Sequence, residues 1–116
     1  MRSALVLGLG QIGTQIARDL TAAGTDVRVM TRSAPSAEAL AVPGTAPGSI
    51  TWEKGDASNT AVVRSAAEAT NAEAIFACVH APYDSRVWAT TLPGLEAAIM
   101  DAAAELGIPV VFPESV

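Results

Sequence analysis

The sequence predicts an α/β fold in which helices cover both faces of one doubly wound parallel sheet. Three observations predict it. A glycine-rich turn directly follows a short apolar run, apolar runs alternate with helical patterns along the chain, and half of the 116 residues are hydrophobic while only 16% are charged. Strands buried on both faces are near-continuous apolar runs, and strands that alternate with helices are typical of parallel sheets. By analogy with doubly wound folds, we expect five strands in the order 3-2-1-4-5.

The first strand and the turn behind it carry the strongest signal. Residues 4–7 are apolar, and Gly8, Gly10 and Gly13 follow with the spacing G-x-G-x-x-G. The first glycine allows a tight turn, the second lets a pyrophosphate lie against bare backbone, and the third lets the next helix pack closely on the strand. The helix that begins at Gln11-Ile12 then points its N-terminus at the phosphate charge. The pattern therefore predicts a dinucleotide site.

The next two segments complete a strand–helix–strand unit. Residues 11–23 have the period of a helix, and Gly24 is placed to end it. The apolar face of this helix is predicted to be Ile12, Ile16, Leu20 and Ala23. Residues 26–31 alternate polar and apolar side chains and form the second strand. These elements fit within about 30 residues, as a βαβ unit requires.

The rest of the chain repeats this alternation after a connection over residues 33–49, which holds three prolines and two glycines. The predicted elements are a third strand at 50–53, a helix at 59–69, a fourth strand at 74–79, a long helix from 88 or 93 to 106, and a fifth strand at 108–112. Because the carboxyl ends of parallel strands meet at one edge, the ligand is expected there, where the strand order reverses.

The end of the second strand indicates which nicotinamide dinucleotide is preferred. Sites for NAD place Asp or Glu there to hold the ribose 2′-hydroxyl, whereas this chain has Thr31, Arg32 and Ser33. A guanidinium can pair bidentately with a 2′-phosphate, and the two hydroxyls add donors. We therefore expect NADP to be preferred over NAD. The alternative is that Arg32 is a solvated loop residue.

Residues after strands 3 and 4 complete the predicted site. Asp56, followed by Ala57, ends strand 3, where a carboxylate can accept a hydrogen bond from an adenine amino group; the alternative is an N-cap of the following helix. His80 and Ala81 follow strand 4, where the loop runs along the cofactor. We interpret His80 as a structural or positioning residue rather than a catalyst. Cys78 lies in the apolar strand and is expected to be buried and inert.

Charge and composition argue against several other classes of partner. The net charge is −5 and there is no basic run, so nucleic acid is not an expected partner. No segment approaches the ~20 apolar residues of a membrane span, so no membrane association is expected and the predicted location is the cytoplasm. One cysteine and one histidine cannot form a structural zinc site alone.

These motifs resemble the short-chain dehydrogenase/reductase superfamily, specifically its extended and atypical branch of NAD(P)-dependent epimerases, dehydratases and reductases. The resemblance extends over essentially all 116 residues. It rests on residues 6–13, 31–33, 55–57, 78–83 and 110–115. It implies a Rossmann fold that binds NAD(P). The extended branch usually has G-x-x-G-x-x-G, so the shorter turn here agrees better with some atypical members.

The resemblance also implies catalytic residues that this chain contains only in part. In the family, strand 5 leads to a serine or threonine that binds the substrate carbonyl, a place that Ser115 occupies here. A Tyr-x-x-x-Lys follows, in which the lysine lowers the pKa of the tyrosine. The only tyrosine in this chain is Tyr83 and the only lysine is Lys54, in the wrong order. We therefore expect residues 1–116 to be a partial domain, the amino-terminal half of a reductase or epimerase, and inactive alone.

An unfinished sheet would expose an edge. Residues 108–112 would lack the sixth strand as a neighbour, and an apolar edge offers unpaired N–H and C=O groups to other chains. Exposed apolar patches above a few hundred Å² are rare on monomers. Self-association through this strand or the adjoining helix faces is therefore expected.

Two other interpretations stay open. One is a stand-alone regulatory nucleotide sensor, like the cytosolic Rossmann domains that gate potassium transporters; Arg32 and the Pro82-Tyr83 loop argue against it. The other is an NADP reductase of the ketopantoate type, which shares the glycine turn and the strand-2 arginine. Residues 55–57 and the helix over 93–106 fit that type less well.

Overall fold

The described part of the chain forms five strands and three helices. This computed structural model describes residues 1–38, 40, 48–78 and 85–113, the range 85–94 by its backbone only. In chain order the elements are β1 (Ser3–Leu7), α1 (Gln11–Ala22), β2 (Asp26–Thr31), β3 (Ile50–Lys54), α2 (Thr60–Thr70), β4 (Ile75–Ala77), α3 (Ser85–Leu106) and β5 (Val110–Val111). None of the described helices is long and apolar enough to cross a membrane.

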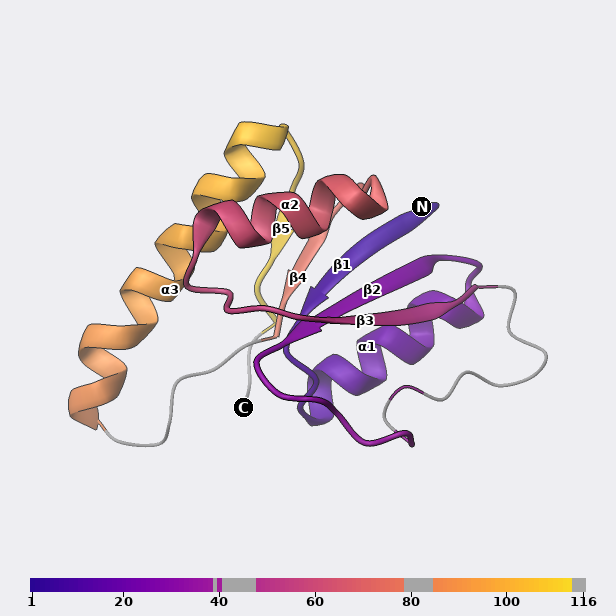
Figure 1. The fold of residues 1–116 in the computed structure, drawn as a ribbon, viewed down its shortest axis with the longest axis horizontal. Coiled ribbons are helices and arrows are strands. Elements are labelled where there is room, and N and C mark those ends of the chain that lie inside the picture. The colour runs from indigo at the N-terminus through magenta and orange to yellow at the C-terminus, as the bar shows by residue number, and fades with distance from the viewer. Residues whose placement is uncertain (39, 41–47, 79–84, 114–116) are drawn as a thin grey trace.

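The strands form one parallel sheet in the order β3-β2-β1-β4-β5, so the predicted α/β fold and strand order are confirmed. Helices α2 and α3 lie on one face of the sheet and α1 on the other (Figure 1). In the register, Leu7 at the end of β1 lies beside Met30 and Ala77, and Thr31 lies beside Lys54. The carboxyl ends of four strands therefore meet at one edge, which brings together three of the predicted site segments.

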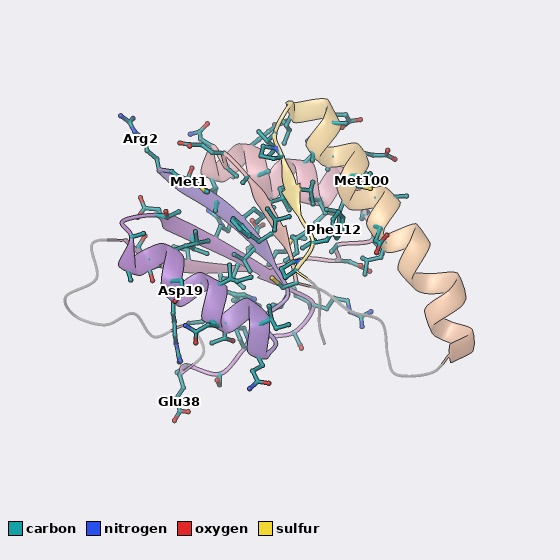
Figure 2. All side chains as sticks on the ribbon, turned by 180° about the vertical axis from the view of Figure 1, so that it is seen from behind. Met1, Arg2, Asp19, Glu38, Met100 and Phe112 are labelled. Carbon is teal, nitrogen blue, oxygen red and sulfur yellow. The ribbon has the colours of Figure 1, made fainter. Side chains whose placement is uncertain are left out.

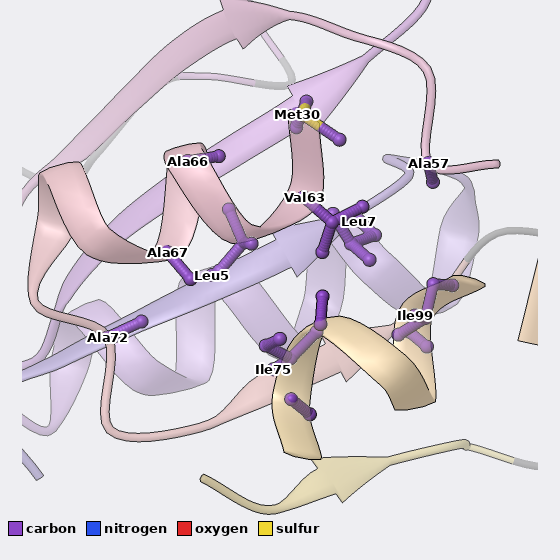
Figure 3. Close-up of a cluster of buried hydrophobic side chains, with 13 residues drawn as sticks. Leu5, Leu7, Met30, Ala57, Val63, Ala66, Ala67, Ala72, Ile75 and Ile99 are labelled. Atoms are coloured by element: carbon purple, nitrogen blue, oxygen red, sulfur yellow. The ribbon is translucent and has the colours of Figure 1, made fainter. Parts of the chain in front are cut away.

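The core alternates along β1 because successive side chains point to opposite faces. Leu5 and Leu7 point toward α2 and α3, where they pack in one cluster with Val63 and Ile99 (Figure 3). Val6 belongs to a second cluster, on the α1 face. These β1 side chains are fully buried, as expected for the central strand of a sheet that is covered on both faces.

Helix α1 buries a different face from the one predicted. Its buried residues are Gly13, Ala17 and Thr21, whereas Ile12 is exposed. Of the other predicted residues, Ile16 and Leu20 are half-buried and Ala23 is exposed. The reason is the close approach of the helix to β1, which places its smallest residues against the sheet and its larger ones beside it. Thr21 tolerates full burial because its hydroxyl bonds back to the carbonyl oxygens of the preceding turn.

The last two strands are shorter than predicted. β4 ends at Ala77 within the described residues, and β5 pairs only through Val110 and Val111, opposite Ile75 and Phe76. Pro109 precedes β5 and has no N–H to donate, although its carbonyl still accepts from Ile75 at 3.0 Å. Helix α3 also begins before both predicted starts.

Candidate dinucleotide site

The turn after β1 has the left-handed conformation that its first glycine predicts. Gly8 has φ +86°, a left-handed conformation that glycine adopts without strain, and its N–H donates to the carbonyl of Met30 at 3.0 Å. Gly10 is the N-cap of α1 and has extended backbone. No side chain caps this helix and its first turn contains no acidic residue. The partial positive charge of the α1 N-terminus is therefore left for a ligand.

Gly13 confirms the third role in the motif. A Cβ built on Gly13 would lie 2.5 Å from the carbonyl oxygen of Gly8 and 3.1 Å from Cβ of Cys78. Only a residue without a side chain lets α1 come this close to both β1 and the end of β4. Thr14 stabilises the same turn. Its N–H donates to the Gly10 carbonyl at 2.9 Å, and its hydroxyl donates to the Leu9 carbonyl at 3.3 Å.

The segment after β2 is held from the side of β3. The indole N–H of Trp52 donates to Oγ1 of Thr31 at 2.7 Å, and the Thr31 hydroxyl donates to the carbonyl of Ser33 at 2.5 Å. The N–H of Gly55 donates to the carbonyl of Thr31 at 3.0 Å. The hydroxyl proton of Thr31 is therefore used in a hydrogen bond within the protein, whereas the sequence predicts that this hydroxyl donates to the 2′-phosphate of a cofactor. Arg32 and Ser33 are exposed at the same edge.

Asp56 presents an ionised carboxylate next to Arg32. Its Oδ1 accepts from the Ser58 hydroxyl at 2.7 Å and from the Ser58 N–H at 2.9 Å. These two hydrogen bonds lower the pKa of Asp56 below its ordinary value, and the positive charge of Arg32 lowers it further. Asp56 is not the N-cap of α2: that position is Asn59, whose side chain accepts from the N–H of Val62 at 3.3 Å.

Gly55 and Ala57, on either side of Asp56, point into the protein. A Cβ on Gly55 would lie 2.5 Å from Sδ of Met30, so a side chain at this position would displace the Met30 side chain from its present packing. Ala57 is buried in the cluster between the sheet and α2. It therefore anchors the segment that carries Asp56.

Cys78 lies where the β4 end meets the glycine turn and is only half-buried. Burial still raises the pKa of its thiol to about 11, so the group is a neutral thiol at physiological pH. Among the described residues, no group of three or more His, Cys, Asp and Glu side chains is placed to hold a metal ion.

The structure thus brings most of the predicted site residues to one edge of the sheet. They are Gly8, Gly10, Gln11, Ile12, Gly13, Thr31, Arg32, Ser33, Asp56 and Ala57. The predicted residues His80, Ala81 and Ser115 lie outside the described part of the chain. Sequence reasoning missed Trp52 and Ser58. In the register of β2 and β3, Trp52 lies opposite Val29 and therefore on the same face of the sheet as Thr31, which the sequence patterns alone do not reveal.

Comparisons with known proteins support a dinucleotide-binding fold. The model of the ketopantoate reductase PanE/ApbA family matches residues 4–100. UDP-glucose 4-epimerase from Bifidobacterium longum, in complex with NAD+ and UDP, is 16% identical with a TM-score of 0.81; 98% of this chain and 37% of that chain are covered. The enzyme of the same name from Brucella ovis, in complex with NAD, is 20% identical with a TM-score of 0.79; the coverage is 97% and 35%. No curated protein matches by sequence.

The family match supports the ketopantoate reductase type, which the sequence left open as an alternative. The likeness to epimerases holds for the fold, and this chain spans little more than a third of their length. Residues 55–57 and the long helix argue against the ketopantoate reductase type in the sequence. The model of that family nevertheless extends from β1 well into α3. The chain therefore belongs to the ketopantoate reductase PanE/ApbA family.

Proposed function

We propose that this chain binds NADP(H) at the carboxyl edge of the sheet, as the dinucleotide-binding part of an NADP-dependent reductase of the ketopantoate type. The single observation that carries the proposal is the exposed guanidinium of Arg32 at the end of β2, in a segment without a carboxylate. It lies at the same edge as the uncapped N-terminus of α1. Two anion-binding features at one edge suit a pyrophosphate and a 2′-phosphate.

The residues present fit this cofactor. The bare backbone of the glycine turn and the amides at Gln11 and Ile12 would hold the pyrophosphate, and Arg32 would pair with the 2′-phosphate. Asp56 is ionised and would accept from the adenine amino group. When bound, NADPH supplies a hydride for carbonyl reduction. The roles of this chain are to bind the adenosine and pyrophosphate groups and to select between the two dinucleotides.

An NAD-dependent epimerase is the second candidate function. It is favoured by one observation, the likeness of the fold to epimerases that were crystallised with NAD. The absence of a carboxylate from residues 31–33 argues against a preference for NAD. For either function we propose that residues 1–116 bind the cofactor but do not turn over substrate alone, because the similar enzymes are far longer.

Calorimetry with NADPH and NADH tests the proposal. The unmodified chain should bind NADPH more tightly, and Arg32→Ala should narrow the difference by one to two decades, since a charge-assisted contact is worth roughly 1.5–3 kcal/mol. Arg2→Ala is the matched control: it removes the same charge from the amino end of β1, where Arg2 is exposed (Figure 2). Equal affinities of the unmodified chain for the two cofactors would refute the preference for NADP.

We also propose that the chain self-associates through its β5 edge. Among the described strands, β5 pairs only with β4. Val111 is 42% exposed and Phe112 39% exposed, and Figure 2 shows Phe112 beside the end of this strand. An apolar edge of this kind favours contact with a second copy. Sedimentation should show association that Val111→Lys weakens; a monomer at high concentration would contradict it.

A further inference from the structure

We infer that Trp52 and Thr31 are positioning residues for cofactor selection, because they fix the backbone on both sides of Arg32. This inference rests on the proposed preference for NADP. It concerns residues that touch no cofactor phosphate themselves. They act through the segment 31–33, which we call the selectivity segment.

The hydrogen bonds of the selectivity segment run in one direction. An indole N–H can only donate, so Oγ1 of Thr31 must accept from Trp52 over the 2.7 Å that separates them. The single proton of the Thr31 hydroxyl is then directed to the carbonyl oxygen of Ser33, which can only accept. Neither group can reverse its role. The chain from Trp52 through Thr31 to Ser33 therefore has one arrangement of protons.

This series of hydrogen bonds holds the backbone on both sides of Arg32. The side chain of Thr31 bonds to the carbonyl two residues ahead, and the carbonyl of Thr31 accepts from the N–H of Gly55. The backbone before and after Arg32 is thus tied both to itself and to the end of β3. The side chain of Arg32 itself is exposed. The selectivity segment is ordered before any ligand arrives, so binding does not have to order it.

Packing and hydrogen bonding of Trp52 can be separated by substitution. Its ring is half-buried beside the cluster on the α1 face that contains Val29. Trp52→Phe keeps an aromatic ring there and removes the N–H together with the second ring of the indole, so the free energy of unfolding of this variant measures the packing that is lost. Thr31→Val keeps the branched shape and removes the hydroxyl, whereas Thr31→Ser keeps the hydroxyl. If Trp52 and Thr31 only filled space, the first two variants would leave cofactor selection unchanged.

The test compares NADPH and NADH affinities of these variants by calorimetry. We expect Trp52→Phe, which removes one hydrogen bond, to weaken NADPH binding roughly three- to tenfold, and Thr31→Val, which removes two, to weaken it at least as much; NADH binding should stay unchanged in both. Thr31→Ser should restore NADPH affinity. Thr70→Val is the matched control, since its hydroxyl accepts from Nε of Arg28 at 2.7 Å and serves no predicted site residue.

A second measurement detects the ordering without a cofactor. In the free protein, amide relaxation should show the backbone of Arg32 and Ser33 as rigid as β2, and more mobile in Trp52→Phe and Thr31→Val. If Arg32→Ala removes the preference while these two variants retain all of it, the inference is wrong and the proposed function stands. If the unmodified chain shows no preference, the proposed function fails and the inference fails with it. Unchanged mobility in both variants would also refute the inference.

Discussion

Replacing Gly13 by alanine tests the close approach of α1 to β1, on which the phosphate turn depends. The added Cβ would lie 2.5 Å from the carbonyl oxygen of Gly8, which belongs to the backbone and cannot rotate away as a side chain would. An ordinary contact needs about 3.4 Å, so the helix and the turn would have to separate by about 0.9 Å. The neighbouring Cβ of Cys78, at 3.1 Å, blocks part of that movement.

Two opposite effects decide how much stability Gly13→Ala costs. Overpacking of this kind costs about 1–3 kcal/mol, while alanine in a helix is favoured over glycine by about 1 kcal/mol. The net loss is thus expected between about 0 and 2 kcal/mol. For a domain near 100 residues, 1 kcal/mol corresponds to roughly 4–8 °C in Tm. The loss of cofactor-binding free energy should exceed this loss of stability, because the atoms that separate belong to the phosphate turn itself.

Thermal unfolding and calorimetric titration with NADPH would measure both effects. Ala22→Gly, at an exposed position in the last turn of α1, reports the difference between glycine and alanine in the same helix without a clash. We expect NADPH affinity to drop at least tenfold in Gly13→Ala and to stay unchanged in Ala22→Gly. A Gly13→Ala chain that gained about 1 kcal/mol of stability and bound NADPH normally would refute the close packing.

Two further predictions concern ionisable groups. Cys78 should react with a thiol reagent at pH 8 roughly a hundredfold more slowly than an ordinary thiol, because a pKa of about 11 in place of 9.0 leaves correspondingly less thiolate; a rate like that of a free thiol would contradict this. The lowered pKa of Asp56 keeps its carboxylate ionised. The stability that this carboxylate contributes to the folded state is therefore fully present above its ordinary pKa of 3.8, and it is lost only as the pH falls through the lower pKa of the folded state. Above about pH 7 the 2′-phosphate, whose second pKa is about 6, is also fully charged, so Asp56→Asn should change NADPH affinity by the same factor between about pH 7 and 8; a factor that varied over this range would contradict it.

Local signals were sufficient to predict where the strands lie, and the analogy with doubly wound folds predicted their order. Residues 26–31 form β2 as predicted, because alternation and flanking turn residues mark a strand within a few positions. The buried face of α1 could not be predicted in the same way. Counting large apolar side chains favours Ile12 and Ile16, but the contact between Gly13 and Gly8 sets how deep the helix lies, and that contact joins two elements.

The candidate site was predicted where a motif exists and missed where it depends on pairing between strands. The glycine turn and Arg32 follow from spacing along the chain. The bond from Trp52 to Thr31 joins residues 21 positions apart and requires the register of β2 and β3. Whether Asp56 caps α2 likewise depends on where the helix begins, which sequence patterns locate only within a few residues.

The motifs could not separate the two candidate families, for a related reason. A glycine turn, a basic residue after the second strand and an acidic residue after the third are features of one half-fold, and several families of dinucleotide-binding enzymes share that half-fold. Residues 55–57 and the long helix belong to the same shared part. They therefore had little power to separate a short-chain enzyme from a ketopantoate reductase, and the match over residues 4–100 decides between them.

The geometry at the end of β2 also sets a limit on how selective the site can be. The selectivity segment is fixed by hydrogen bonds, yet the guanidinium of Arg32 is exposed, where water and salt screen its charge. Asp56 lies near enough to Arg32 to have its pKa lowered by it, so a bound 2′-phosphate would meet a carboxylate as well as a guanidinium. Attraction by one group and repulsion by the other partly cancel. A preference that weakens as the ionic strength rises is therefore what this arrangement supports, and the ordering of the segment before binding adds to what the charge of Arg32 contributes.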